Sequence, residues 1–134
     1  MKPRNNGTWT EARFNSFVKG ALRAVCSKWG PIALCKKRAR VRRGWYLCAG
    51  CKQEVVATTP AVYQSGKKKG QPYRRKNAIV DHIEPIVPAE GFTTWDEVVR
   101  RMFCEVDNLQ LLCHDCHQLK CAEERKERNN AKRS

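Results

Sequence analysis

Two segments of the chain, Cys48-Ala49-Gly50-Cys51 and Cys113-His114-Asp115-Cys116, share the spacing C-x-x-C, with 61 residues between them. Each spacing lets two thiolates converge from one tight turn, and four thiolates form a closed tetrahedral site for Zn²⁺. The sequence therefore predicts one structural zinc site, made by Cys48, Cys51, Cys113 and Cys116. The alternative is a set of buried or redox-active thiols, but the paired spacing favours the metal.

Such a site would link two segments that lie far apart in the sequence. Metal binding of this kind contributes about 10 kcal/mol or more of folding free energy in zinc-binding peptides. A chain of 134 residues forms a domain whose core is small, so a stabilising metal is plausible. The other four cysteines lack this spacing and are expected to be ordinary core or surface thiols: Cys26, Cys35, Cys104 and Cys121.

Charge is distributed unevenly along the chain. Lys and Arg number 27 against 13 Asp and Glu, for a net charge of +14. Residues 1–47 carry +11 and residues 48–76 carry +6, whereas residues 77–112 carry −5. Any single charge run is usually a solvated surface, but this excess predicts a polyanionic partner, and nucleic acid fits best. The acidic segment suits a divalent cation.

The sequence also excludes some classes of protein. Apolar residues make up 41% of the chain, too many for a disordered tail. We find no apolar run of the roughly 18 to 20 residues that a membrane span needs, and no apolar segment typical of a signal peptide. We therefore expect a cytoplasmic protein that does not bind membranes, whose cysteines serve as metal ligands or free thiols rather than disulfides. The sequence assigns no oligomeric state.

Periodicity and capping signals predict an α+β domain. Helices are expected over residues 8–29, where Thr8 and Glu11 have capping-box spacing, over 32–43, over 95–103 after Thr94, and from Asp115 onward. Short strands are expected over residues 45–47, 54–57 and 77–83, with a cationic loop over 58–76. We divide the chain into a basic helical N-terminal extension (1–44), packed on the core, and a zinc-bound core with a charged C-terminal helix (45–134).

A second group of residues suggests phosphodiester chemistry: Asp81 and His82, then Asn108, then His117. A phosphodiester resists attack because its charge repels nucleophiles and its leaving alkoxide is poor. An imidazole with a pKa near ~6.5 is well suited to take a proton from water at neutral pH. A divalent cation can neutralise the developing charge. Asp and His are reasonable ligands for such an ion, with water and substrate phosphate completing its shell.

These residues resemble the HNH endonucleases, and more closely the small phage-encoded members. The resemblance rests on Cys48-x-x-Cys51, on the block Val80-Asp81-His82-Ile83-Glu84-Pro85, and on the segment from Trp95 through Asn108 and His117 to Lys120. It covers about residues 45–121. The family's small glycine-rich turn between the Asp-His strand and the Asn is replaced here by residues 90–103, with a predicted helix.

The resemblance implies a zinc-stapled ββα-metal (His-Me finger) core and a metal-dependent endonuclease that hydrolyses DNA. His82 matches the general base that activates a water, and Asp81 and His117 match the ligands of a single catalytic divalent ion. Asn108 matches the central residue that fixes the loop and orients the base. The products would carry 5′-phosphate and 3′-hydroxyl ends, and the setting would be a phage protein in its host's cytoplasm.

The identity of the ion and the place of the second histidine stay open from the residues alone. A mixed N/O site with one histidine accepts magnesium, manganese or a softer transition ion. Two neighbours in a strand point to opposite faces, so Asp81 and His82 can share a centre only near a strand end, which Pro85 makes credible. His117 could also be an alternate zinc ligand or cap the last helix, although four cysteines already complete that site.

Ten basic residues are predicted to contact nucleic-acid phosphates: Lys36, Lys37, Arg38, Arg40, Arg42, Arg43, Lys67, Lys68, Lys69 and Lys120. Structured RNA is an alternative substrate, because Tyr63 and Tyr73 near the cationic loop could stack on unpaired bases. The rival from another class is a non-catalytic, zinc-stabilised nucleic-acid-binding accessory protein. A pure binder would have no need for the Asp81, His82, Asn108 and His117 set.

Overall fold

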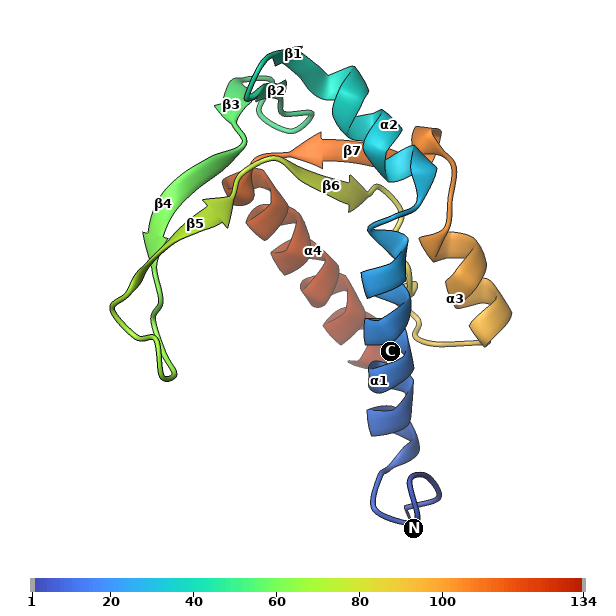
Figure 1. The fold of residues 1–134 in the computed structure, drawn as a ribbon. Coiled ribbons are helices and arrows are strands. Elements are labelled where there is room, and N and C mark those ends of the chain that lie inside the picture. Colours follow the sequence, from blue (N-terminus) through green and yellow to red (C-terminus); the bar gives the residue numbers. More distant parts are fainter. Residues whose placement is uncertain (1, 134) are drawn as a thin grey trace.

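The computed structural model describes residues 2–133 and has an α+β architecture (Figure 1). Within these residues the α-helices are α1 (Glu11–Cys26), α2 (Gly30–Ala39), α3 (Trp95–Met102) and α4 (His114–Arg133), with a short 3-10 helix, η1, over Val106–Asn108. None of them has both the length and the apolar character that a membrane crossing requires.

The strands form three small antiparallel sheets. The first contains β1 (Arg40–Arg42), β2 (Trp45–Leu47) and β3 (Glu54–Val56), in that order. The second is a hairpin of β4 (Thr58–Val62) and β5 (Pro72–Lys76). The third pairs β6 (Ile79–His82) with β7 (Leu109–Leu112), which are separated in sequence by α3 and η1.

The described residues contain two small hydrophobic clusters. In the first, Cys26 at the end of α1 packs with Val98 and Met102 of α3, and Leu22 and Trp29 cover them. The first helix thus packs on the rest of the protein through its C-terminal half. Phe17 and Val25 of the same helix are apolar but 61% and 58% exposed.

The second cluster lies at the cysteine site. Cys48 packs with Leu112 and Cys113, and Val55 and Ala49 lie against them. The sheet that contains β2 is therefore held against the end of β7 by a core of a few side chains. A core this small makes a metal between the two segments energetically important.

The start of α1 differs from the prediction. Thr10 caps the helix, since its side chain accepts a hydrogen bond from the backbone N–H of Arg13 at 3.2 Å. The Thr8 hydroxyl instead donates to the carbonyl of Asn5 at 2.6 Å, within a preceding turn. A threonine engaged in that turn is not free to cap the helix, so the predicted capping box was wrong by two residues.

Two predicted segments have a different secondary structure. The second helix ends at Ala39, because Arg40 has extended backbone angles, and Arg40–Arg42 form β1 instead of a last helical turn. Residues 58–76, predicted as a loop, form the β4–β5 hairpin with five cross-strand pairs from Thr58↔Lys76 to Val62↔Pro72. Glycines and lysines lie only at its tip, whereas Thr, Val and Tyr along its sides favour strands.

The third sheet and the helix after it form one β6–β7–α4 unit. Asp81 pairs with Gln110 and His82 with Leu109, at the last two positions of β6. β7 ends at Leu112 and α4 begins at His114, so that only Cys113 lies between them. Figure 1 shows α4 running back beneath this sheet. The end of β6, which contains Asp81 and His82, therefore lies against the first turns of α4.

Candidate metal centre and adjoining polar site

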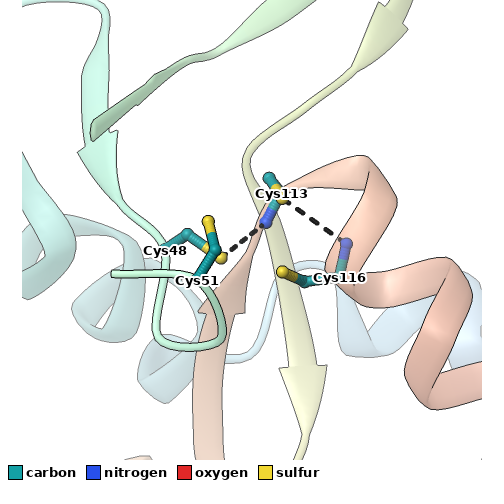
Figure 2. A group of neighbouring side chains, drawn as sticks. All are labelled: Cys48, Cys51, Cys113 and Cys116. Carbon is teal, nitrogen blue, oxygen red and sulfur yellow. Dashed lines mark hydrogen bonds between the residues drawn. The ribbon is translucent and has the colours of Figure 1, made fainter. Parts of the chain in front are cut away.

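The four cysteines of the two C-x-x-C segments lie together, as Figure 2 shows. Their sulfur atoms all lie within 4.8 Å of one another. Four sulfurs bound to one zinc at about 2.3 Å would be ~3.8 Å apart, so a small contraction closes the site. The cluster can therefore hold a metal ion such as zinc, as predicted for Cys48, Cys51, Cys113 and Cys116.

Backbone hydrogen bonds position these sulfurs. The N–H of Cys113 donates to Sγ of Cys48 at 3.3 Å, and the N–H of Cys116 donates to Sγ of Cys113 at 3.4 Å (Figure 2). The N–H of Ala49 donates to the carbonyl of Leu111 at 2.8 Å, which joins the first turn to β7. Gly50 packs so tightly that a Cβ there would lie 2.9 Å from Sγ of Cys116.

The thiols of this cluster differ in acidity. Burial raises the pKa of Cys48, but hydrogen bonds from the backbone N–H groups of Cys113, Cys51 and Gly50 outweigh it and lower the pKa to about 6. The hydrogen bond with Cys113 and burial raise the pKa of Cys116 to about 12. Burial also raises the pKa of Cys113. Without a metal, the site therefore favours one thiolate, and four thiolates become favourable only when a cation is bound.

Asp81 lies at the centre of an adjoining polar site on β6. Its Oδ1 lies 3.7 Å from Nε2 of His117 on α4. Its Oδ2 accepts a hydrogen bond from the side-chain amide of Gln110 at 3.0 Å and forms an ion pair with Nζ of Lys120 at 3.0 Å. The carboxylate is only 10% exposed, so β6 and α4 meet at a largely buried charge.

The ammonium of Lys120 is shared among three oxygen atoms. Besides Asp81, it contacts Glu124 Oε2 at 2.9 Å and donates to the backbone carbonyl of His82 at 2.7 Å. Burial lowers the pKa of Lys120, but the hydrogen bonds with Glu124 and Asp81 and the charges of both carboxylates together raise it above its ordinary value. The predicted phosphate contact of Lys120 gains no support, because these oxygens already engage the ammonium.

His82, the last residue of β6, points toward a different element from Asp81. Its Nε2 lies 2.8 Å from the carbonyl oxygen of Met102, the last residue of α3. Because a carbonyl oxygen only accepts, Nε2 is the donor in this contact, which leaves Nδ1 as the ring nitrogen that can accept a proton. Within residues 2–133, no hydrogen bond joins this ring to Asp81 or His117. The divergence of the two side chains is what strand geometry requires.

Asn108 fixes the chain immediately after His82. Its side-chain Oδ1 accepts a hydrogen bond from the N–H of Glu84 at 3.0 Å, and its backbone carbonyl accepts from the N–H of Ile83 at 2.9 Å. These two bonds extend the contact between the two chain segments to Ile83 and Glu84, beyond the last β6–β7 pair of His82 with Leu109. Asn108 therefore fixes the path of the backbone immediately after His82, the predicted general base.

The separation of Asp81 and His117 suits a shared ion. Two ligand atoms about 2.1 Å from one metal at a tetrahedral angle lie ~3.4 Å apart, close to the observed 3.7 Å. They supply only two protein ligands: in the part of the chain that the structure describes, the four cysteines are the one group of three or more with metal-ligand spacing. The predicted ligand pair thus lies together, and other ligands would be water or substrate.

Nine of the predicted phosphate-binding residues lie outside this site, in two groups. Six come from the end of α2 and from β1 with its following turn, and all are exposed: Lys36, Lys37, Arg38, Arg40, Arg42 and Arg43. Arg42 is paired with Glu54 and lies over the Trp45 ring. The other three, Lys67, Lys68 and Lys69, are exposed at the tip of the β4–β5 hairpin.

Sequence reasoning missed three participants at the polar site, namely Gln110, Glu124 and the Met102 carbonyl. It also assigned Lys120 to a phosphate rather than to the oxygens that it contacts. The helical spacing of His117, Lys120 and Glu124 on one face was available in the sequence. The pairing of Gln110 opposite Asp81 was not, because it depends on the register of β6 with β7. The Met102 carbonyl left no signal, because a backbone atom has no residue type.

The chain was compared with family models, with curated proteins and with solved structures, and nothing matches in any of the three.

Proposed function

We propose that this protein is a metal-dependent endonuclease of the HNH type that hydrolyses DNA phosphodiester bonds. The observation that carries the proposal is the 3.7 Å separation of Asp81 Oδ1 and His117 Nε2. These residues come from positions 36 apart in the sequence, and both match ligands of the catalytic ion in the family that the sequence resembles. The HNH family remains a resemblance in the residues.

The order of elements supports this proposal. A ββα-metal core needs two antiparallel strands followed by a helix, with the base on the first strand and a ligand on the helix. Here β6 contains His82 at its end, β7 is its antiparallel partner, and α4 contains His117. The cysteine cluster joins the turn after β2 to the junction between β7 and α4, where the helix of this unit begins.

The contacts of His82 suit a general base. The bond to the Met102 carbonyl at 2.8 Å fixes the ring and leaves Nδ1 as the proton acceptor. Lys120 holds the backbone carbonyl of the same residue, and Asn108 fixes the two residues that follow. In the proposed reaction, Nδ1 takes a proton from a water whose oxygen attacks the phosphorus atom. The bond from phosphorus to the 3′ oxygen breaks, and that oxygen takes a proton from solvent to become the 3′-hydroxyl.

Asp81 and His117 would hold the divalent ion. When bound, this ion neutralises charge on the phosphate and on the departing oxygen. Oδ2 of Asp81 is held by Gln110 and Lys120, which leaves Oδ1 directed toward His117. Magnesium, manganese or a softer transition ion fits one carboxylate and one imidazole.

The net charge of +14 supports a nucleic-acid substrate. Exposed cations at the end of α2 and at the hairpin tip would contact phosphates of the bound DNA. With six to eight such contacts, the log–log dependence of DNA binding on salt should have a slope of about −5 to −7. A slope near zero would contradict binding by phosphate contacts.

The proposal is tested by plasmid nicking with zinc-loaded protein and a series of added divalent ions. Wild type should nick supercoiled plasmid only with the added ion, and His82→Ala should lose the activity while keeping its fold and DNA affinity. His114→Ala is the matched control, because His114 lies on α4 and contacts Gln118 rather than the polar site. Retained cleavage by His82→Ala would refute the base assignment, and no cleavage by wild type with any ion would favour the non-catalytic binding protein.

A further inference from the structure

The β4–β5 hairpin is a narrow two-stranded arm. We call residues 58–76 the arm; it consists of five cross-strand pairs and a tip over residues 63–71. Five residues of paired strand span about 17 Å. Figure 1 shows this arm extending away from the helices and from the other two sheets. The arm is therefore long enough to reach part of a bound partner that the rest of the protein does not contact.

The charge of the arm has one sign. It contains six Lys and Arg and no Asp or Glu, namely Lys67, Lys68, Lys69, Arg74, Arg75 and Lys76. Within the described residues, none of the six forms an ion pair with a carboxylate. Six cations without counter-charges repel one another, which a protein tolerates readily where a polyanion neutralises them. The complementary partner is a phosphate backbone.

The tip of the arm is ordered by its own hydrogen bonds. The N–H of Tyr63 donates to the carbonyl of Gln71 at 3.0 Å, and the N–H of Gly70 donates back to Tyr63 at 2.8 Å. Gly66 and Gly70 have φ values of +79° and +84°, which glycine adopts without strain. The lysines are thus presented on a defined turn, so that little backbone entropy is lost on binding.

The two tyrosines of the arm are already stacked on each other. The rings of Tyr63 and Tyr73 lie 4.5 Å apart between centroids with an interplanar angle of 27°, and Lys68 lies over the Tyr63 ring at 5.7 Å. This stacking occupies one face of each ring, and Lys68 lies over Tyr63, so the pair offers little ring surface for unpaired bases. This contact argues against the single-stranded binding that the sequence left open.

We propose that the arm binds double-stranded DNA by entering the major groove, with its lysine tip and its basic edge against the phosphates that border the groove. This inference rests on the proposed DNA substrate and adds to it the form of the DNA and the groove. The major groove, about 12 Å wide, admits a two-stranded β-ribbon without deformation of the DNA, whereas the minor groove, about 6 Å wide, would first have to be widened. The glycines at the tip let the backbone approach the groove floor closely.

Dimethyl sulfate footprinting tests the groove directly, because the reagent methylates guanine N7 in the major groove and adenine N3 in the minor groove. The zinc-loaded full chain is bound to a DNA duplex without added Mg²⁺ or Mn²⁺. We compare wild type with K67Q/K68Q/K69Q, and with R125Q/K126Q/R128Q, which removes three exposed charges from α4. Circular dichroism and zinc content establish that each variant is folded.

We expect wild type to protect a run of guanine N7 atoms, and the arm variant to lose that protection. Its salt slope should fall by about 3 units, and its affinity for duplex by about tenfold or more, while the α4 variant keeps the N7 protection. Any of three results would overturn the proposal. The first is protection confined to adenine N3, and the second is N7 protection that is unchanged in the arm variant. The third is tighter binding to single-stranded DNA or RNA than to duplex.

The two proposals fail separately. Arm-dependent N7 protection by a protein that never cleaves DNA would contradict the proposed hydrolysis and support the arm. The reverse outcome is metal-dependent cleavage by wild type together with an unchanged N7 footprint in K67Q/K68Q/K69Q. It would support the proposed hydrolysis and contradict the role of the arm.

Discussion

The ammonium of Lys120 lies 3.0 Å from Oδ2 of Asp81, on the side of the carboxylate away from His117. Oδ2 also accepts from Gln110, so one oxygen is committed to holding the carboxylate and the other faces the imidazole. The lysine therefore neutralises part of the site's charge in the absence of a divalent ion, and it orients Asp81 for the ion that we propose.

Lys120→Met should destabilise the protein. The change removes contacts to three oxygens and leaves the carboxylates of Asp81 and Glu124 in a largely buried position without their cation, at a cost of about 2–3 kcal/mol. We expect added Mn²⁺ to raise the melting temperature of this variant more than that of wild type. Lys126→Met, at an exposed position of the same helix, should behave as wild type. Equal unfolding free energies for the two variants would contradict the role of Lys120.

Zinc binding to the cysteine cluster should release at least two protons at pH 7.5. The pKa values of Cys113 and Cys116 lie above the ordinary range, at about 12 for Cys116, so both thiols are protonated before the metal binds. Zinc displaces these protons, and its affinity must rise with pH and fall on acidification. Isothermal titration calorimetry in buffers of different ionisation enthalpy measures the number. A value near zero would mean that the thiols are not the ligands.

Gly50→Ala should weaken the metal site. The added Cβ would lie 2.9 Å from Sγ and 3.0 Å from Cβ of Cys116, so the first turn must move away from α4. We expect a lower zinc content and a lower melting temperature. Gly20→Ala is the matched control, because it adds the same methyl group in α1, where nothing lies within 4 Å, and should stabilise the helix by up to about 1 kcal/mol. Wild-type zinc affinity in Gly50→Ala would show that the close packing is unimportant.

Asn108→Ala should slow DNA cleavage without releasing zinc. The variant loses the acceptor for the N–H of Glu84, and the segment after His82 is then less well fixed. One lost hydrogen bond of this kind costs about 1–2 kcal/mol of stability. Single-turnover cleavage with a saturating divalent ion measures the effect on the chemical step. An unchanged rate would separate Asn108 from the positioning of the base.

The parts of the fold that side-chain pattern determines were predictable. The C-x-x-C spacing gave the cysteine cluster, and Thr94 caps α3 through the N–H of Glu97 as expected. Strands β2 and β3 were also found, because turn residues border them. Asp81 and His117 lie together, as the resemblance implied, although no local pattern relates them; their meeting depends on β6 pairing with β7.

The rest of the fold and of the site could not be predicted, because the sequence offers alternative local structures and contacts without showing which of them is more stable. Thr8 and Thr10 both offer a capping hydroxyl, and the turn that contains Asn5 engages the first. The arm contains enough glycine and lysine to resemble a loop, but its cross-strand pairs determine its structure. Lys120 has the charge of a phosphate ligand, and only tertiary contacts show that two carboxylates and a carbonyl surround it.

In the mechanism that we propose, Asp81 and His117 bind one divalent ion beside a separate cysteine site. Electron paramagnetic resonance of Mn²⁺ added to zinc-loaded protein tests it most directly, with wild type, His117→Ala and the control His114→Ala. We predict one bound Mn²⁺ in wild type and in His114→Ala, and none in His117→Ala, whose zinc content stays that of wild type. Mn²⁺ binding that persists in His117→Ala, or loss of zinc from that variant, would contradict the claim.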